Sequence, residues 1–231
     1  TYGVWLTMSS IVGWFVFFDV GLTHGLRNRF AEAKARGDDN LARAYVSTTY
    51  FILGIIFSGV WLIFLITNNF LDWSKILNVS ANMRSDVTTL AIIVFTYFCI
   101  SFVFRIITTI LLADQYPAKS SLIDLMGQAL ALIIILVLVR TTEGSLIKLG
   151  LALCVSPLIV IIGANFIFFN GRYKKYRPSF ATVKLSHTKN LFSLGVKFFI
   201  IQLAAIIQYQ TANIIIARSF GTADVTAYNV V

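Results

Sequence analysis

Residues 19–50 read DVGLTHGLRNRFAEAKARGDDNLARAYVSTTY and separate two long apolar stretches of the chain. A cation-rich loop between two membrane-length segments marks the cytoplasmic side under the positive-inside rule. We therefore interpret this loop as cytoplasmic, and the direction of every later span follows from it. The cations of this topology loop are Arg27, Arg29, Lys34, Arg36 and Arg43.

The composition predicts an integral membrane protein. Of the 231 residues, 58% are hydrophobic and 13% are charged, whereas soluble domains carry about 25% charged residues. One helical crossing takes about 20 apolar residues, so we predict an all-α polytopic helical bundle with six spans and the start of a seventh. The net charge of +9 does not indicate nucleic-acid binding, because the cations form separate clusters between apolar segments.

The apolar segments, together with the capping and turn residues at their ends, locate the predicted spans. Gly37 suits a helix C-cap, and Asp38 or Asp39 suits the N-cap of the helix that follows. Pro117 suits a helix start or turn, and Ser120 or Ser121 can cap the next helix. The loops that this topology places inside carry twelve Lys and Arg against five outside. The predicted spans are 3–22, 46–67, 87–112, 122–139, 146–169 and 191–217.

Motifs for enzymatic chemistry are absent from the sequence. The G-x-x-x-x-G-K-[ST] motif, which binds nucleotide phosphates, does not occur in the sequence. The G-x-S-x-G motif, which carries the nucleophile of many hydrolases, does not occur either. Cys99 and Cys154 lie singly in apolar runs, without metal-ligand spacing. We therefore predict no enzyme activity, no cofactor and no metal site.

Charged residues inside the predicted spans are the first candidates for a site. Such groups are costly in hydrocarbon and usually face a bundle interior or a water-filled cavity. Asp19, Arg105, Asp124 and Lys197 all lie within about two turns of the inner surface. Arg105 lies about 10 Å deep by its helix position, and Asp124 on the next helix is at comparable depth, so the two can pair. The alternatives are a structural salt bridge or snorkelling to the interface.

The span 191–217 is the most polar one. Gln202, Tyr209 and Asn213 are spaced by seven and four residues, so they share one helix face, and Gln208 lies beside them. This face is expected to line an aqueous passage. It could equally form hydrogen bonds between packed helices.

Several motifs together resemble polysaccharide and O-antigen flippases of the multidrug/oligosaccharidyl-lipid/polysaccharide exporter superfamily. The resemblance covers nearly the whole chain and is weakest between residues 122 and 170. Its motifs are Tyr-Gly-Val-Trp at 2–5, Phe-Asp-x-Gly-Leu at 18–22, the Arg-rich segment ending in Gly-Asp at 37–38, Ala-Asp-Gln-Tyr-Pro at 113–117, the polar stretch 202–213, Phe-Gly at 220–221 and Ala-Tyr-Asn-Val at 227–230.

The resemblance implies about helices two to seven of a larger two-lobed transporter. Residues 1–189 would belong to the first lobe and 190–231 would start the second. The implied substrate is an undecaprenyl-diphosphate-linked oligosaccharide, flipped to the outer leaflet of a bacterial or archaeal cytoplasmic membrane for cell-surface polysaccharide synthesis. Membrane lipid, polysaccharide polymerase and chain-length proteins are the other implied partners.

The same resemblance suggests roles for the polar residues of the spans. Arg105 and Lys197 would hold phosphate oxygens, and Gln202, Gln208 and Asn213 would bind sugar hydroxyls. Asp19 and Asp124 keep open a multidrug cation antiporter of the same superfamily, which would need acidic groups in its cavity. A lipid II flippase and a membrane scaffold without a passage remain further alternatives.

Overall fold

The computed structural model of the chain describes residues 22–77, 79–141 and 145–189, together with 191, 193, 195–197, 200, 201 and 204. The elements assigned in this part of the chain are α-helices and short 3-10 helices. Four of the described helices are long and apolar enough to cross a membrane. The prediction of an all-α polytopic membrane protein is therefore confirmed, while span 3–22 and most of span 191–217 lie outside the described residues.

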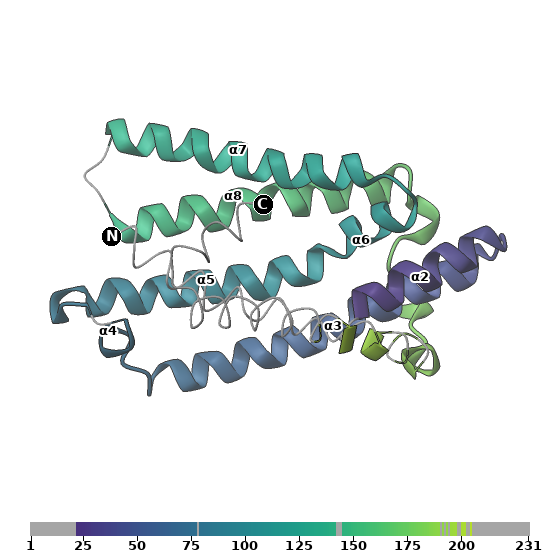
Figure 1. The fold of residues 1–231 in the computed structure, drawn as a ribbon, viewed down its shortest axis with the longest axis horizontal. Coiled ribbons are helices and arrows are strands. Elements are labelled where there is room, and N and C mark those ends of the chain that lie inside the picture. Colours follow the sequence, from purple (N-terminus) through teal and green to yellow (C-terminus); the bar gives the residue numbers. More distant parts are fainter. Residues whose placement is uncertain are drawn as a thin grey trace, which may run out of the picture.

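The long helices lie side by side, and α2 projects beyond them at one end (Figure 1). Short 3-10 turns interrupt the connections: η2 Ala81–Met83, η3 Lys174–Tyr176, η4 Phe180–Thr182 and η5 Leu185–His187. The α-helices are α2 Leu22–Ala35, α3 Asp39–Asn68, α4 Trp73–Ile76, α5 Arg84–Phe104, α6 Ile106–Ala113, α7 Pro117–Thr141 and α8 Leu146–Asn170.

Three segments far apart in the sequence meet at one end of the bundle. These are α2, the connection between α6 and α7, and residues 171–189 (Figure 1). We call this the basic end. The opposite end holds α4, the start of α5 and the start of α8 (Figure 1). The sequence placed the three basic segments on one side of a membrane, and the structure agrees with that grouping.

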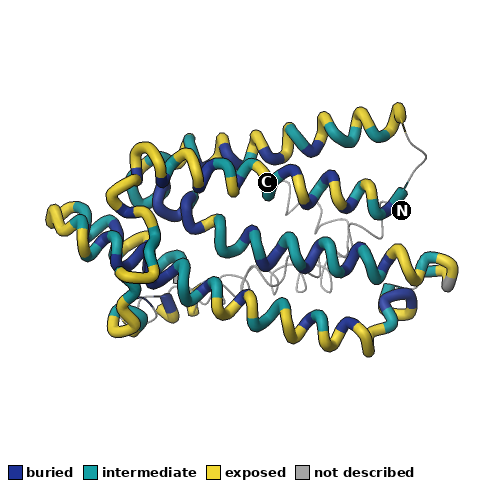
Figure 2. Tube along the Cα trace, turned by 180° about the vertical axis from the view of Figure 1, so that it is seen from behind, coloured by how far each residue is buried: buried dark blue, intermediate teal, exposed yellow. Residues whose placement is uncertain are grey.

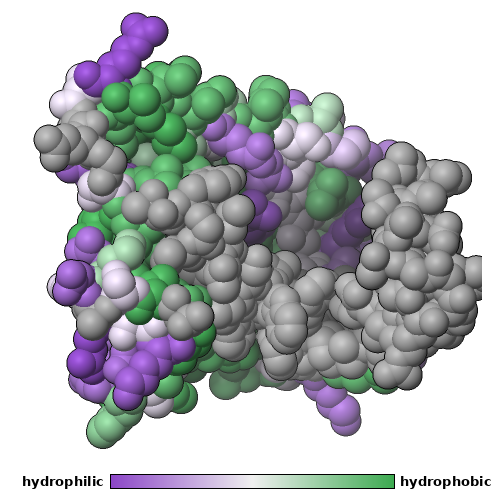
Figure 3. Space-filling model, turned by 60° about the vertical axis from the view of Figure 1, so that its left-hand side comes forward, coloured by the Kyte–Doolittle hydropathy of each residue, from purple (hydrophilic) through white to green (hydrophobic). Residues whose placement is uncertain are grey.

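The outer faces of the helices are apolar. Exposed residues recur along α3 and α7 in the burial view (Figure 2), and apolar surface covers much of the described part of the face in Figure 3. Ile66 on α3 is 64% exposed and Val139 on α7 is 75% exposed. Soluble monomers rarely show contiguous apolar surface of this kind, so these faces suit contact with lipid in a multi-pass membrane protein.

Local signals explain where the helices begin and end. Gly37 follows α2 with φ +73°, a conformation in which glycine carries no steric cost. The Asp38 side chain then accepts a hydrogen bond of 2.9 Å from the Leu41 N–H and caps α3, as predicted. The expected cap at Ser120 or Ser121 is wrong: α7 already begins at Pro117, and Ser120 is buried within it. Proline favours the first helical position. Helix α7 therefore begins five residues before the predicted membrane span 122–139.

Helices α7 and α8 approach closely at one glycine. A Cβ added at Gly127 would lie 3.0 Å from the Pro157 Cα atom, so a larger side chain would push the two helices apart. We expect Gly127→Leu to destabilise the protein by about 1–3 kcal/mol through overpacking, measured by thermal unfolding in detergent. Gly163→Leu is the control, because a Cβ at Gly163 meets nothing within 4 Å. Equal unfolding temperatures of the two variants would contradict the close contact.

Candidate functional site

A charged residue lies where one membrane helix is interrupted. Arg105 separates α5 from α6 and has φ −65° and ψ −10°. Its N–H donates to the Ser101 carbonyl at 2.8 Å, and its carbonyl accepts from the Thr108 N–H at 2.9 Å. The predicted span 87–112 agrees with α5 and α6, which together form one membrane-length stretch, Arg84–Ala113. The helix interruption is confined to Arg105, whose backbone stays in the right-handed helical region.

Arg105 pairs with Asp124 across two helices. The Arg105 Nη2 atom lies 2.9 Å from the Asp124 Oδ1 atom. Asp124 is seven residues into α7, which puts it about 10 Å from the start of that helix. The two side chains are 54% and 41% exposed. The structure thus joins the pair that the sequence allowed, and both side chains stay partly exposed.

Further polar side chains surround this ion pair. Tyr97, Ser101 and Gln128 line a small cavity of about 60 Å³ with Arg105 and Asp124, between α5, α7 and α8. A water molecule takes about 30 Å³ of liquid, so the cavity has room for water but not for a sugar.

The sequence contained a signal for these additional residues. Tyr97 and Ser101 precede Arg105 by eight and four residues, and Gln128 follows Asp124 by four. Residues four apart share one face of a helix. Two short polar stripes on neighbouring spans therefore indicated one shared polar site.

Asn165 on α8 holds the helix interruption in place. Its Nδ2 atom donates to the Phe104 carbonyl and to the Ile161 carbonyl, both at 2.8 Å. Its Oδ1 atom accepts from the Tyr50 hydroxyl at 2.5 Å. Backbone groups freed inside a membrane need such partners, because hydrocarbon offers none. Asn165 thereby fixes the peptide that precedes Arg105.

We expect Asn165→Leu to destabilise the protein by about 2–3 kcal/mol, because the Phe104 carbonyl and the Tyr50 hydroxyl lose their partner. Thermal unfolding in detergent measures the change. Asn28→Leu, at an exposed position of helix α2, is the matched control. If both variants unfold at the same temperature, the hydrogen bonds of Asn165 do not hold the interruption.

The other predicted site residues do not join this cluster within the described part of the chain. Lys197 is exposed, and the ion pairs between described residues do not include it. No group of three or more His, Cys, Asp or Glu among the described residues could hold a metal ion. Asp19, Gln202, Gln208 and Asn213 lie outside the described residues.

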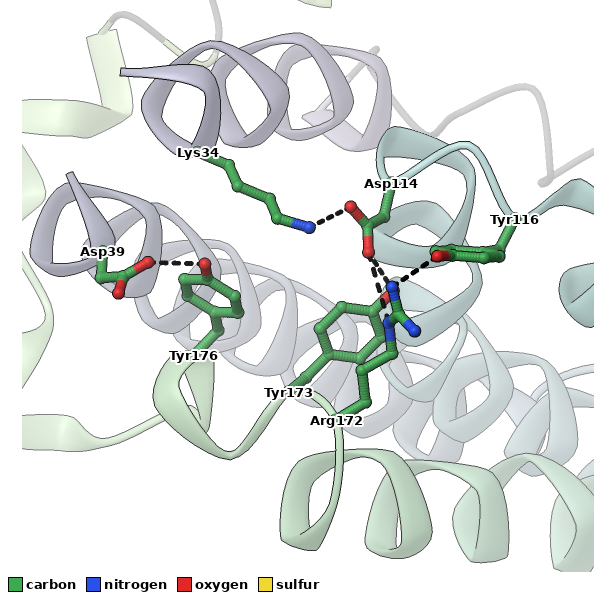
Figure 4. A network of polar contacts seen from close by, with 7 residues as sticks. All are labelled: Lys34, Asp39, Asp114, Tyr116, Arg172, Tyr173 and Tyr176. Atoms are coloured by element: carbon green, nitrogen blue, oxygen red, sulfur yellow. Dashed lines mark hydrogen bonds and ion pairs between the residues drawn. The ribbon is translucent and has the colours of Figure 1, made fainter. Parts of the chain in front are cut away.

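A second polar cluster ties the basic end together around Asp114 (Figure 4). The Asp114 carboxylate accepts from the Lys34 ammonium of α2 and, at 3.0 Å, from the Tyr173 hydroxyl. The Arg172 Nε atom lies 3.6 Å from the Asp114 Oδ2 atom. The Arg172 Nη2 atom donates to the Tyr116 hydroxyl at 2.5 Å. Three chain segments therefore meet at one carboxylate. The sequence did not reveal it, because its partners lie 58 to 80 residues away.

The charge state of Asp114 follows from these contacts. Burial alone raises its pKa, but the hydrogen bonds from Lys34 and Tyr173 and the charge of Arg172 outweigh burial and hold the pKa below its usual range. Asp114 is therefore ionised at neutral pH and acts as a fixed anion among cations.

The remaining cations of the topology loop lie at this same end. Arg29 and Arg36 both pair with Glu32, at 2.8 Å and 2.6 Å. The Arg43 Nε atom donates to the Arg177 carbonyl at 3.0 Å, and Arg27 is exposed. These side chains organise the basic end rather than the site at Arg105.

Comparison with known proteins agrees with a membrane transport system. Residues 2–231 match the family described as Polysaccharide biosynthesis protein. A curated protein of Salmonella typhi, described as "Putative O-antigen transporter", is 24% identical over 235 residues. The match covers 100% of this chain and 52% of that relative, so the chain spans about half the length of the relative. No solved structure matches the chain.

Proposed function

This chain belongs to the polysaccharide biosynthesis protein family, and from that membership we propose that it forms about half of a transporter rather than an enzyme. The proposed substrate is an undecaprenyl-diphosphate-linked oligosaccharide, carried from the inner to the outer leaflet of the cytoplasmic membrane. The observation that supports this most directly is the half-exposed Arg105–Asp124 ion pair between two helices that are apolar enough to cross a membrane.

The physical problem for such a transporter is the diphosphate. Its charge cannot enter hydrocarbon without partners, because an isolated buried anion costs many kcal/mol. An arginine offers a planar set of donors that matches phosphate oxygens in two places at once. Arg105 supplies that group from a helix interruption, where its guanidinium is 54% exposed.

Asp124 gives the empty site a counter-ion. While no substrate is present, it neutralises Arg105 at 2.9 Å, which lowers the cost of keeping the cation within the membrane. An arriving diphosphate carries more negative charge and competes for the same guanidinium. The pair therefore opens to the substrate and closes after its release.

Residues in and near the predicted span 191–217 would bind the sugar and make a second contact with the diphosphate. Lys197 would hold phosphate oxygens, and Gln202, Gln208 and Asn213 would bind sugar hydroxyls, with Asp19 at the edge of the cavity. An inside-negative membrane potential would favour outward movement of the anion by about 2.3 kcal/mol per charge per 100 mV.

The ion pair also weighs against an organic-cation substrate. A multidrug antiporter needs an acidic group free to meet a cation, whereas Asp124 is already neutralised by Arg105. The pairing therefore favours an anionic headgroup over a cationic drug.

The test of this function is made in cells with the full-length gene deleted. We expect lipid-linked oligosaccharide to accumulate on the inner leaflet and surface polysaccharide to disappear, with both reversed when the gene is restored. The accumulated lipid is measured by mass spectrometry of extracted membranes. Unchanged surface polysaccharide, with no accumulated intermediate, would overturn the proposal.

A further inference from the structure

The chain after α8 turns back along the first turns of α3. We call residues 177–189 the strap. The Ser179 N–H donates to the Ser47 hydroxyl at 3.1 Å, and the Lys184 N–H donates to the Thr48 hydroxyl at 3.0 Å. Thr182 also shares a hydrogen bond of 2.7 Å with Ser47. The strap thus lies beside residues 47 and 48 of α3, where span 46–67 is predicted to begin.

The strap carries large apolar side chains that are exposed. Phe180 is 85% exposed and Leu185 is 64% exposed. Both lie outside the helices that are long and apolar enough to cross a membrane. The two hydrogen bonds to α3 hold this part of the strap beside the start of the predicted span 46–67, and these side chains stay largely exposed there.

Cations accompany these apolar side chains. Residues 171–191 contain no Asp or Glu. Lys184 and Lys189 are exposed, and the ion pairs between described residues include neither of them. Among the described residues, the Arg177 guanidinium donates to a neutral oxygen, that of Asn170 at 3.3 Å, and takes part in no ion pair. The strap therefore carries positive charge that nothing in the described part of the chain neutralises.

A cavity opens between the strap and α3. It measures about 260 Å³, and its lining includes Tyr50 and Phe51 of α3 and Phe180 and Val183 of the strap. The Phe51 and Phe180 rings meet edge to face, with centroids 6.2 Å apart. The lining is mostly apolar, with hydroxyl groups of Ser47 and Ser179 at its polar side.

We propose that the strap and this cavity form a binding site for an anionic phospholipid of the leaflet at the basic end. Apolar side chains beside lysines are the pattern of segments that lie in a membrane interface. Each Lys or Arg near an anionic bilayer surface adds attraction for its headgroups. The lipid phosphate meets Lys184 and Lys189, and the upper part of an acyl chain enters the cavity beside Phe180. This site is separate from the Arg105–Asp124 pair and does not depend on the proposed transport.

The first experiment measures where Phe180 lies. The full-length protein carries a spin label at Phe180→Cys, with Cys99 and Cys154 replaced by alanine, in vesicles of 30% phosphatidylglycerol and 70% phosphatidylcholine. We expect the label to lie at the boundary between headgroups and acyl chains, more accessible to oxygen than to a water-soluble nickel complex. A label open to the nickel complex would overturn the proposal. A label shielded from both reagents would also overturn it, and would indicate a protein partner instead.

The second experiment tests the lysines. Binding of phosphatidylglycerol to the full-length protein is titrated by native mass spectrometry for wild type and for Lys184→Gln/Lys189→Gln. We expect the affinity to fall at least fivefold. Lys75→Gln/Lys148→Gln, which removes two exposed cations from the opposite end, is the charge-matched control and should change it less than twofold. Equal losses in both variants would show nonspecific attraction and overturn the site. Transport plays no part in either readout, so failure here leaves the proposed function untouched.

Discussion

Replacing Arg105 with alanine should reduce transport by the full-length protein by about 10–100-fold, because hydrogen bonds to charged groups contribute about 1.5–3 kcal/mol. The loss should appear in a flipping assay with reconstituted vesicles at matched protein levels. Arg84→Ala is the control, because Arg84 begins α5 at the opposite end and is 65% exposed. That variant should transport normally.

A charge exchange separates substrate binding from simple structural pairing. Arg105→Asp/Asp124→Arg keeps one cation and one anion across the same two helices, but it moves the cation away from the helix interruption. If the pair only holds helices together, the exchange restores both folding and transport. We expect it to restore the amount of folded protein and to leave transport impaired. Full recovery of transport would remove Arg105 from the substrate site.

Asp114→Ala should strongly destabilise the protein. It leaves Lys34 and Arg172 as two neighbouring cations without their shared anion, and the Tyr173 hydroxyl without its acceptor. Breaking a buried pair costs about 3–5 kcal/mol, and the exposure of both cations reduces this to about 2–3 kcal/mol. Thermal unfolding in detergent measures it. Asp86→Ala, an exposed acid at the opposite end, is the control, and equal effects of the two would contradict the role of Asp114.

The ionised Asp114 carboxylate should also make the stability of the protein depend on pH. Its pKa is lower in the folded protein than in the unfolded chain, where it is about 3.9. The stabilisation is therefore complete above about pH 5 and is lost as the pH falls through the folded pKa. Unfolding temperatures measured from pH 6 down to pH 3 should fall more steeply for wild type than for Asp114→Asn. Parallel curves would show that Asp114 does not gain its stability from ionisation.

Local sequence rules predicted most of the described architecture. Gly37 and Asp38 marked the change from α2 to α3, and span 146–169 agrees closely with α8, Leu146–Asn170. The start of α7 was placed five residues late. Lys119 and Ser120 looked like loop residues, but a helix that leaves the membrane carries polar residues in its outer turns. Hydropathy therefore located the membrane part of that helix and not its full length.

The site was predictable only where its residues share a helix face or an obvious depth. Arg105 and Asp124 stood out because charges are rare inside apolar spans. The sequence did not predict the helix interruption at Arg105, because the residues around it are common in membrane-spanning helices. Asn165, which is 60 residues away, supplies a hydrogen bond to the Phe104 carbonyl at the interruption. Contacts of that range arise from packing, and a single sequence does not specify them.

The ion pair between neighbouring spans also has a consequence for biogenesis. Ribosomes release the helix with Arg105 before the helix with Asp124, so the arginine enters the bilayer first and alone. Arg105 lies about 12 Å from the end of α6. An arginine opposes insertion by about 2.5–3.5 kcal/mol at the helix centre, so the cost at Arg105 is smaller than this. The α7–α8 hairpin, which follows directly, brings the compensating acid. Arrival of the α7–α8 hairpin should thus stabilise the earlier helix in the membrane, which gives these neighbouring spans an order of assembly.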